Sequence, residues 1–494
     1  MAFIDGTAVN VALPALQANL NATVVDVQWV VESYALLLAS LLLVGGSLGD
    51  RFGRRRIFCI GVVVFALASV WCGLAAGVGQ LIAARAVQGV GGALLVPGSL
   101  AIISASFDED ARGQAIGTWS GFTAITAAVG PVLGGWLIEH VSWRAVFWIN
   151  APLALAVLLI TFKYVPESWG GDRGKALDWQ GAGLAALGLG ALVYGLVESS
   201  RSSLTHLPVL AALVSGALLL GAFVVVEARI RDPMLPLTLF RSRNFAGANL
   251  LTLFLYMALS GALFFFPLDL IQVRGYPATQ AGAALLPFIL IMFLLSRWSG
   301  GLVKRYGGKL PLVVGPVIAA LGFALFVLPG GGGTYWTTFF PAVVVLGLGM
   351  AISVAPLTTV VMNAVPEQRA GVASGVNNAV SRTAGLLGVA VMGIVMLHGF
   401  NRDLDRRLAD LNVAPDVRHL LDQQRVRLAG AEVPAGVDPE QRRALERAVD
   451  ESFGFGFRLV MAGAAVLALA SACASMLMID GRRLVRGESR RASA

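Results

Sequence analysis

The sequence predicts an all-α, polytopic membrane protein with fourteen transmembrane helices, and three observations carry this prediction. Hydrophobic residues make up 57% of the 494 residues and charged residues only 13%, whereas soluble proteins carry about 25% charged residues. The apolar residues form runs of about 20, the length that spans a bilayer as a helix. Lys and Arg residues gather in alternate loops between these runs, as expected of cytoplasmic loops.

Fourteen apolar runs follow one another along the chain. They span residues 1–20, 27–48, 57–76, 80–106, 113–138, 145–165, 179–197, 207–226, 245–273, 277–298, 310–328, 336–365, 371–400 and 455–478. Cys59, Cys72 and Cys473 all lie in these runs, and three is an odd number. We therefore expect buried membrane cysteines rather than a disulfide framework.

Lys and Arg residues are divided unequally between the two sides that alternating runs define. One side holds twenty of them in its loops and tail, and the short loops of the other hold only Arg144, Arg201 and Arg274. Because cytoplasmic loops carry the excess, the first side is predicted to be cytoplasmic, with both termini there, in a multi-pass protein of the inner (plasma) membrane. The twenty are Arg51, Arg54, Arg55, Arg56, Arg112, Arg173, Lys175, Arg229, Arg231, Arg241, Arg243, Lys304, Arg305, Lys309, Arg369, Arg482, Arg483, Arg486, Arg490 and Arg491.

An internal repeat divides the chain. GSLGDRFGRR at residues 46–55 follows the second run, and GGLVKRYGGK at 300–309 follows the tenth. A second pair, DAR at 110–112 and EQR at 367–369, recurs at nearly the same offset. We predict an N-terminal six-helix half at 1–165, an inserted helix pair with its linkers at 166–244, and a C-terminal six-helix half at 245–478. The last includes an external loop at 401–453, and a basic cytoplasmic tail follows at 479–494.

Four segments resemble motifs of the fourteen-helix drug–proton antiporter branch of the major facilitator superfamily, which comprises multidrug efflux transporters. IDGTAVNVALP at 4–14 is similar to the first-helix motif and GSLGDRFGRRR at 46–56 to the cytoplasmic loop motif. RAVQGVGG at 85–92 is similar to the fourth-helix motif and GPVLGG at 130–135 to the fifth-helix motif associated with antiporters. The resemblance covers essentially the whole chain. It implies the major facilitator fold and export of small amphipathic or drug-like molecules by proton antiport through alternating access.

The loop motif is the candidate cytoplasmic gate. Its glycines permit a tight turn, and Asp50 can pair with nearby arginines or approach a helix N-terminus. Positive-inside topology is the alternative, but it explains only the arginines. Lys304 stands where Asp50 stands in the second copy, so we expect the first copy to carry the gate. The gate residues are Gly46, Asp50, Arg51, Gly53, Arg54, Arg55 and Arg112.

The fifth-helix motif comprises Gly130, Pro131, Gly134 and Gly135. Its glycines allow another helix to approach closely, and its proline bends the helix. The resemblance implies a role in antiport, and close packing alone is the alternative.

Charged residues inside apolar runs are costly to bury, which makes them candidates for proton coupling. The resemblance matches Asp5 to the first-helix acid of the family and Arg85 to the fourth-helix arginine implicated in proton transfer. A carboxylic acid in an apolar cavity can bind and release protons near neutral pH. Glu32, toward the external end of its run, is a second candidate, or an interfacial residue facing water. Arg85 can also be a structural counter-ion for either acid.

Candidate substrate-cavity residues are the polar and aromatic groups Asn10, Tyr34, Gln88, Trp119, Phe122, Tyr256, Asn377, Asn378 and Arg382. Most such aromatics simply face lipid or neighbouring helices. Arg382 with the two asparagines can bind an anionic group or pair with a cavity acid. The sequence therefore does not require a cationic substrate.

The stretch 401–453 contains many acids and arginines, and Leu404, Leu408 and Leu411 indicate a short amphipathic helix. It is predicted to form either a small cap over the outer mouth or a solvated spacer. The basic tail is expected to meet anionic lipid.

The remaining features narrow the class of protein. The chain lacks a Gly-rich lysine loop for ATP, and its four histidines and three cysteines are scattered, so neither an enzyme, a metal site nor a cofactor other than a proton gradient is predicted. The basic residues behind the net charge of +8 lie in short loops, so no nucleic-acid partner is expected. We expect a monomer in the lipid bilayer. Asp5 lies only about 6 Å from the start of its run at 1.5 Å per residue. In the family that the first-helix motif resembles, about two more turns precede this acid, so the resemblance implies a start upstream of Met1.

Three functions stay open from the sequence. The first is a proton-driven multidrug or antiseptic exporter. The second is an exporter dedicated to one metabolite, such as an antibiotic, siderophore or lipid. The third is a non-transporting membrane sensor on the same fold.

Overall fold

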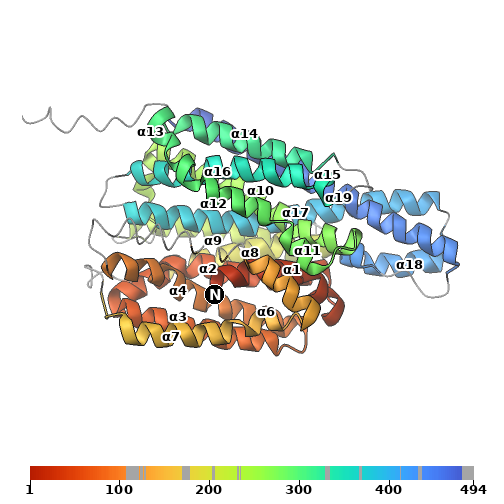
Figure 1. Ribbon diagram of the computed structural model, residues 1–494, viewed down its shortest axis with the longest axis horizontal. Coiled ribbons are helices and arrows are strands. Elements are labelled where there is room, and N and C mark those ends of the chain that lie inside the picture. Colours follow the sequence, from red (N-terminus) through yellow and green to blue (C-terminus); the bar gives the residue numbers. More distant parts are fainter. Residues whose placement is uncertain are drawn as a thin grey trace, which may run out of the picture. The chain divides into compact units, whose positions relative to one another are not determined.

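The computed structural model describes residues 1–106, 122, 126, 129–169, 178–202, 206–230, 233, 235–328, 334–365, 370–411, 413–431 and 437–480. Every regular element within these residues is helical (Figure 1). Eleven of their helices are long and apolar enough to cross a membrane. The all-α polytopic prediction is therefore confirmed, while the total of fourteen stays a prediction.

The first part of the chain forms helices that follow the predicted apolar runs, with the run at 145–165 divided into α6 and α7. They are α1 (Ala2–Leu20), α2 (Val24–Phe52), α3 (Arg54–Gly73), α4 (Val78–Ser106), α6 (Ala145–Trp148), α7 (Asn150–Tyr164), α8 (Trp179–Ser202) and α9 (Leu207–Arg229). Of the run predicted at 113–138, the described residues from 129 onward are helical, through residue 140.

The second part contains more interruptions. Its elements are η1 (Leu237–Arg241), α10 (Arg243–Leu268), η2 (Asp269–Val273), α11 (Ala278–Ala283), α12 (Leu286–Gly300), α13 (Leu302–Tyr306), α14 (Lys309–Leu325), α15 (Tyr335–Thr338), α16 (Phe340–Asn363), α17 (Ala370–Asp410), α18 (Pro415–Gln424), η4 (Arg425–Gly430) and α19 (Pro439–Met478). The helices α17 and α19 extend well into the predicted external loop at 401–453.

The chain packs into two compact units. Unit 1 comprises Met1–Pro236, Leu259–Leu286 and Arg382–Met461. Unit 2 comprises Leu237–Ala258, Pro287–Ser381 and Ala462–Ala494. Unit 1 contains both acids that are candidates for proton coupling, Asp5 and Glu32, and most of the motif residues.

Local sequence sets the sharp turn between α1 and α2. Asn21 ends α1 in the left-handed conformation, with φ of 52°, which asparagine adopts more readily than most residues. Thr23 and Asp26 then form a capping box, in which the Asp26 backbone N–H donates to Thr23 Oγ1 (3.2 Å) and the Thr23 N–H donates to the Asp26 carboxylate (2.8 Å). The box satisfies backbone donors at the start of α2.

Glycines of the fourth-helix motif let α4 touch two neighbours. A Cβ on Gly89 would lie 2.5 Å from the Tyr34 carbonyl oxygen of α2, and one on Gly91 would lie 2.5 Å from the Phe65 backbone nitrogen of α3. Small residues permit this backbone approach between membrane helices. The motif thereby brings α2, α3 and α4 together around the residues described below.

The cysteine prediction is confirmed for two residues and wrong for one. All three cysteines are free, and Cys59 and Cys72 are buried, but Cys473 is exposed on α19. Its position in an apolar run did not distinguish the outer face of a helix from its packed face.

We predict that Gly91→Ala destabilises the protein, because the new methyl group collides with the α3 backbone. Overpacking of this kind costs about 1–3 kcal/mol, measured as a lower thermal unfolding temperature in detergent. Gly183→Ala on α8 is the matched control, since nothing lies within 4 Å of its Cβ position. Equal unfolding temperatures for the two variants would contradict the packing role of Gly91.

Candidate functional site

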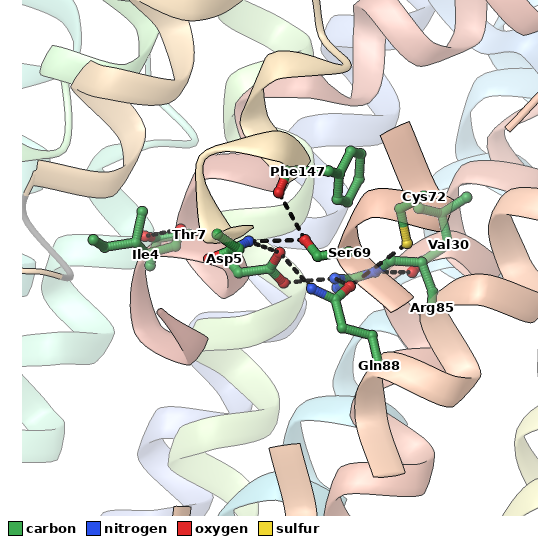
Figure 2. Close-up of polar contacts among 10 residues, drawn as sticks. Ile4, Asp5, Thr7, Val30, Ser69, Cys72, Arg85, Gln88 and Phe147 are labelled. Atoms are coloured by element: carbon green, nitrogen blue, oxygen red, sulfur yellow. Dashed lines mark hydrogen bonds and ion pairs between the residues drawn. The ribbon is translucent and has the colours of Figure 1, made fainter. Parts of the chain in front are cut away.

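A buried carboxylate, Asp5 of α1, lies at the centre of a polar cluster (Figure 2). Arg85 of α4 donates from Nη1 to Asp5 Oδ2 at 2.5 Å. Gln88 of α4 donates to Oδ1 at 2.9 Å, and Asn150 of α7 donates to the same oxygen at 3.2 Å. Both carboxylate oxygens are therefore engaged. Because Asp5 is 0% exposed, these contacts replace the hydration that its charge would have in water.

The buried guanidinium of Arg85 is surrounded by hydrogen-bond acceptors and an aromatic ring. Its side chain is 1% exposed. Its Nε donates to the Val30 carbonyl at 3.1 Å, and its Nη1 also donates to Gln88 Oε1 at 2.7 Å. The Tyr34 ring centroid lies 4.2 Å from its Cζ, a cation–π distance. One cation thus joins α1, α2 and α4.

A second layer fixes the groups that hold Asp5. Asn150 also donates to Ser69 Oγ of α3 at 3.0 Å, and that hydroxyl donates to the Phe147 carbonyl of α6 at 2.8 Å. Cys72 lies 3.6 Å from Gln88 Oε1. Helices α1, α2, α3, α4, α6 and α7 therefore share one network, and a change in the charge of Asp5 acts on all of them.

Glu32 lies on a different face of α2. It is 1% exposed, and neither carboxylate oxygen has a hydrogen-bond partner among the described residues. One turn earlier, Gln28 donates to the Val389 carbonyl of α17 at 3.4 Å. One turn later, Leu36 packs in a cluster with Leu386 of α17. Residues four apart share a helix face, so Glu32 lies where α2 packs on α17.

The predicted substrate-cavity residues occupy varied places. Tyr34 and Gln88 are buried in the Asp5 cluster. Arg382 of α17 interacts electrostatically with Tyr34, which places it near that cluster. In unit 2, Asn377 donates to Asn249 (3.1 Å) and Thr252 (2.7 Å) of α10.

The other members of that set differ in their exposure to solvent. Asn10 and Tyr256 are partly buried, Asn378 is exposed and Phe122 is 64% exposed. Trp119 lies outside the described residues.

The cytoplasmic loop motif forms contacts at the α2–α3 junction. Arg54 donates from Nε to Asp50 Oδ1 at 2.8 Å and from Nη1 to the Ala101 carbonyl of α4 at 3.3 Å. Gly53 has φ of 106°, a conformation that favours glycine. A Cβ there would also lie 2.8 Å from the Glu167 carboxyl carbon. The positive φ of the turn therefore favours glycine at position 53, and a larger residue there would displace the Glu167 carboxylate.

Glu167 ties this junction to the segment after α7. Its carboxylate accepts the backbone N–H groups of Arg55 (2.9 Å) and Arg56 (3.2 Å), at the N-terminus of α3. Arg55 Nη1 donates to the Val165 carbonyl at 3.0 Å. An acid at this position suits the positive end of a helix.

The remaining candidate gate residues have fewer recorded contacts where they are described. Gly46 faces Pro97 of α4, with its Cβ position 3.7 Å from the proline Cβ. Arg51 is exposed, with its Cζ 5.4 Å from the centroid of the Phe52 ring. Arg112 lies outside the described residues.

Comparison with known proteins places this geometry in a family. The family model described as Major Facilitator Superfamily matches residues 1–389. The chain belongs to the Major Facilitator Superfamily. It is therefore a polytopic membrane transporter of that superfamily, and the recognition made from the four motifs is confirmed.

Similar proteins of this superfamily are antibiotic and multidrug resistance transporters. The "Tetracenomycin C resistance and export protein" of Streptomyces glaucescens is 33% identical over 477 residues, covering 95% of this chain and 88% of that protein. "Multidrug resistance protein Stp" of Mycobacterium tuberculosis (strain CDC 1551 / Oshkosh) is 35% identical over 427 residues, covering 85% of this chain and 78% of that protein.

Solved structures show the same fold. A bacterial homologue of the human lysosomal transporter Spinster, in its inward-facing and unoccupied conformation, matches with a TM-score of 0.69 at 18% identity, over 97% of this chain and 95% of that one. The xylose transporter XylE from E. coli, in its inward open conformation, matches with a TM-score of 0.59 at 13% identity. The match covers 98% of this chain and 95% of XylE. These likenesses concern the major facilitator fold alone.

The fifth-helix motif of this superfamily chain packs against two helices. Cβ atoms on Gly134 and Gly135 would lie 2.8 Å from the Ala8 Cβ of α1 and 2.5 Å from the Ala278 carbonyl oxygen of α11. Gly130 faces Thr7 of α1. The glycines therefore permit close packing beside Asp5, which is one of the two roles the sequence left open.

The predicted external loop of the transporter is largely helical where it is described. Leu404 and Leu408 are buried on the extended α17. In η4, the Arg427 carbonyl accepts from Gln17 of α1 at 3.2 Å, and its guanidinium donates to Asn21 Oδ1. These contacts favour a cap on the end of α1 over a solvated spacer.

Arg425 anchors this cap to its own hairpin. It forms ion pairs with Asp405 of α17 and Asp422 of α18. Burial lowers the pKa of the Arg425 guanidinium, but hydrogen bonds to these two acids outweigh burial and hold the pKa above its ordinary value.

Sequence reasoning missed two members of the site. Asn150 lies at a helix start within an apolar run, and an uncharged amide there gave no signal as strong as a buried charge. Glu167 follows α7 in a linker, where an acid is unremarkable until its contacts with the start of α3 are known.

We predict that Asp5→Asn destabilises the transporter, because it leaves Arg85 buried without its counter-ion. Breaking a buried pair from one side costs about 3–5 kcal/mol. Thermal unfolding in detergent should therefore show a large loss for Asp5→Asn and for Arg85→Gln. The double variant should lose less than the sum, since it leaves no unpaired charge. Strictly additive losses would show that the two side chains do not interact.

Proposed function

We propose that this transporter exports small amphipathic or drug-like molecules by proton antiport through alternating access. The observation that carries the proposal is the fully buried Asp5 carboxylate, bound by Arg85, Gln88 and Asn150. Relatives of this transporter are named for antibiotic resistance and export or for multidrug resistance. Together these support a proton-binding acid inside an efflux transporter.

A proton on Asp5 changes what its neighbours experience. Protonation removes the negative charge that Arg85 faces at 2.5 Å. The guanidinium, still held by the Val30 carbonyl and Gln88, then carries an uncompensated buried charge. That charge stabilises whichever conformation gives Arg85 a new partner, and antiport requires such a difference between two states.

Glu32 is the second proton site in this proposal. Neither of its carboxylate oxygens has a hydrogen-bond partner in the described part of the chain, and it lies where α2 packs on α17. An unpaired charge at such a place is costly, so the neutral acid suits the packed interface. Separation of the two helices admits water and favours loss of the proton. Proton binding there is thereby linked to the packing of the predicted halves.

Two contacts within unit 1 join the predicted N-terminal and C-terminal halves and bear on whether the transporter is open or closed to the outside. Gln272 of η2 donates to Gln17 of α1 at 2.9 Å. The Glu139 carboxylate accepts the Thr279 backbone N–H of α11 at 2.7 Å. Both pairs lie at the predicted external ends of their helices. We therefore infer a state closed to the outside. We also propose that both chain termini are cytoplasmic, because most Lys and Arg residues of the loops and tail fall on that predicted side.

A dedicated exporter of one natural product is the second candidate. It is favoured by relatives named "Methylenomycin A resistance protein", "Puromycin resistance protein pur8" and "Probable actinorhodin transporter". The Asp5–Arg85 pair is neutral overall, so the cluster selects no substrate charge. Substrate breadth separates the two candidates. A multidrug exporter transports both ethidium and puromycin, whereas a dedicated exporter transports neither or one.

Gradient-driven transport tests the coupling. Proteoliposomes with an acidic lumen should accumulate ethidium or puromycin from a pH 7.5 medium, and nigericin should abolish this accumulation. Asp5→Asn should reduce it to the level of empty liposomes, because the site can no longer exchange a proton. Glu32→Gln should also slow it.

Asp416→Asn is the matched control, since Asp416 is exposed on α18. It should transport like the wild type. Transport that ignores the gradient and survives Asp5→Asn would exclude proton antiport at this acid.

Cross-linking tests alternating access. Gln17→Cys with Gln272→Cys, in a Cys473→Ser background that keeps the buried Cys59 and Cys72, places two thiols at the contact between α1 and η2. A short bifunctional methanethiosulfonate should stop gradient-driven accumulation, and dithiothreitol should restore it. Each single-cysteine variant should stay active with the reagent. Full activity of the cross-linked protein would mean that these ends never separate.

A further inference from the structure

A groove lies on the outer face of unit 1 between α3 and α7. Its cavity volume is about 440 Å³. Arg55, Arg56 and Glu167 supply its charged lining, and its other lining residues are Cys59, Ile60, Val63, Val64, Leu158 and Phe162. None of these side chains contributes to the buried Asp5 network. A basic end and an apolar floor match the two parts of an amphipathic anion.

The groove opens toward the surroundings of the helices rather than toward the interior. Ile60 is 43% exposed, Val63 40% and Phe162 64%. In a transporter in which α3 and the segment Ala145–Tyr164, comprising α6 and α7, have the length and apolarity of membrane spans, such side chains meet acyl chains. The arginines begin α3, at its predicted cytoplasmic end, where lipid headgroups lie.

The positive charge at this end is not cancelled by the one acid that lines the groove. The Glu167 carboxylate accepts backbone N–H groups of Arg55, Arg56 and Ser168, and lies 3.9 Å from Arg55 Nε. Arg56 is exposed, and the structure records no ion pair for its side chain within the described residues. Two guanidiniums and the positive end of α3 thus outweigh one carboxylate.

We propose that this groove binds an anionic phospholipid of the cytoplasmic leaflet. The headgroup phosphate lies against Arg55 and Arg56, and an acyl chain lies between α3 and α7. Basic pockets at the cytoplasmic side of membrane helices suit lipid phosphates. A soluble anion would use only the arginines, and a neutral apolar molecule only the floor, whereas this ligand uses both.

Native mass spectrometry of the full-length transporter in detergent tests the proposal, with dioleoylphosphatidylglycerol as the probe. Wild type should bind this lipid more tightly than dioleoylphosphatidylcholine. Arg56→Gln should weaken binding about fivefold, the usual effect of one basic residue at an anionic surface. Ile60→Trp should abolish it by filling the floor. Arg229→Gln and Leu67→Trp, exposed residues outside the groove, should bind like wild type.

Each contrary result overturns the proposal. Equal binding of the two lipids or an unchanged Arg56→Gln affinity means that the arginines do not select a phosphate. Competition by glycerol 3-phosphate means a soluble-anion site, and competition by ethidium means a substrate portal. Thermal unfolding confirms that each variant is folded. If Ile60→Trp does not fold, the comparison of Arg56→Gln with its control variant Arg229→Gln still tests the proposal. The readout is binding, so it stands whether or not proton antiport does.

Discussion

The buried ion pair between Asp5 and Arg85 is the interaction on which the N-terminal helices depend. Neither charge can be buried alone at tolerable cost, so each needs the other and its secondary partners. Arg85 reaches the Val30 carbonyl of α2 while it holds Asp5 of α1. Its one guanidinium therefore fixes the mutual positions of α1, α2 and α4. The motif glycines serve this arrangement, because Gly89 and Gly91 bring α4 near enough for a side chain to span both neighbours.

The residues of this cluster lie far apart in the sequence, which limited how many of them could be predicted. Asp5 and Arg85 are 80 residues apart, and Asn150 is 145 from Asp5. Sequence can identify a charge in an apolar run as costly, and it did so for both members of the pair. It cannot identify the amide that completes the shell, since an asparagine in a membrane helix has many uses. Glu167 was missed for a similar reason, because its role appears only when the start of α3 lies beside it.

Helix bounds were predictable where hydropathy alone sets them. The runs at 57–76 and 207–226 correspond closely to α3 and α9. The helices α17 and α19 were not predictable in length, because they continue past the apolar run into charged sequence. There the helix is kept by a buried stripe that includes Leu404 and Leu408 and by the ion pair of Arg407 with Asp403 at 2.7 Å. The criterion of an apolar run ends where such amphipathic packing begins.

The two proposed proton sites differ in a way that bears on their roles. Asp5 has donors on both carboxylate oxygens, so in the proposed mechanism a proton there leaves the buried Arg85 without its counter-ion. Glu32 has no recorded donor and lies at the packing surface with α17. A proton there is held only while that surface is closed, because opening replaces the apolar neighbour with water. If both sites operate, Asp5 determines whether Arg85 has a counter-ion, and the charge of Glu32 depends on whether α2 and α17 are in contact. Antiport needs both functions, since protonation must be tied to a conformation as well as to a binding site.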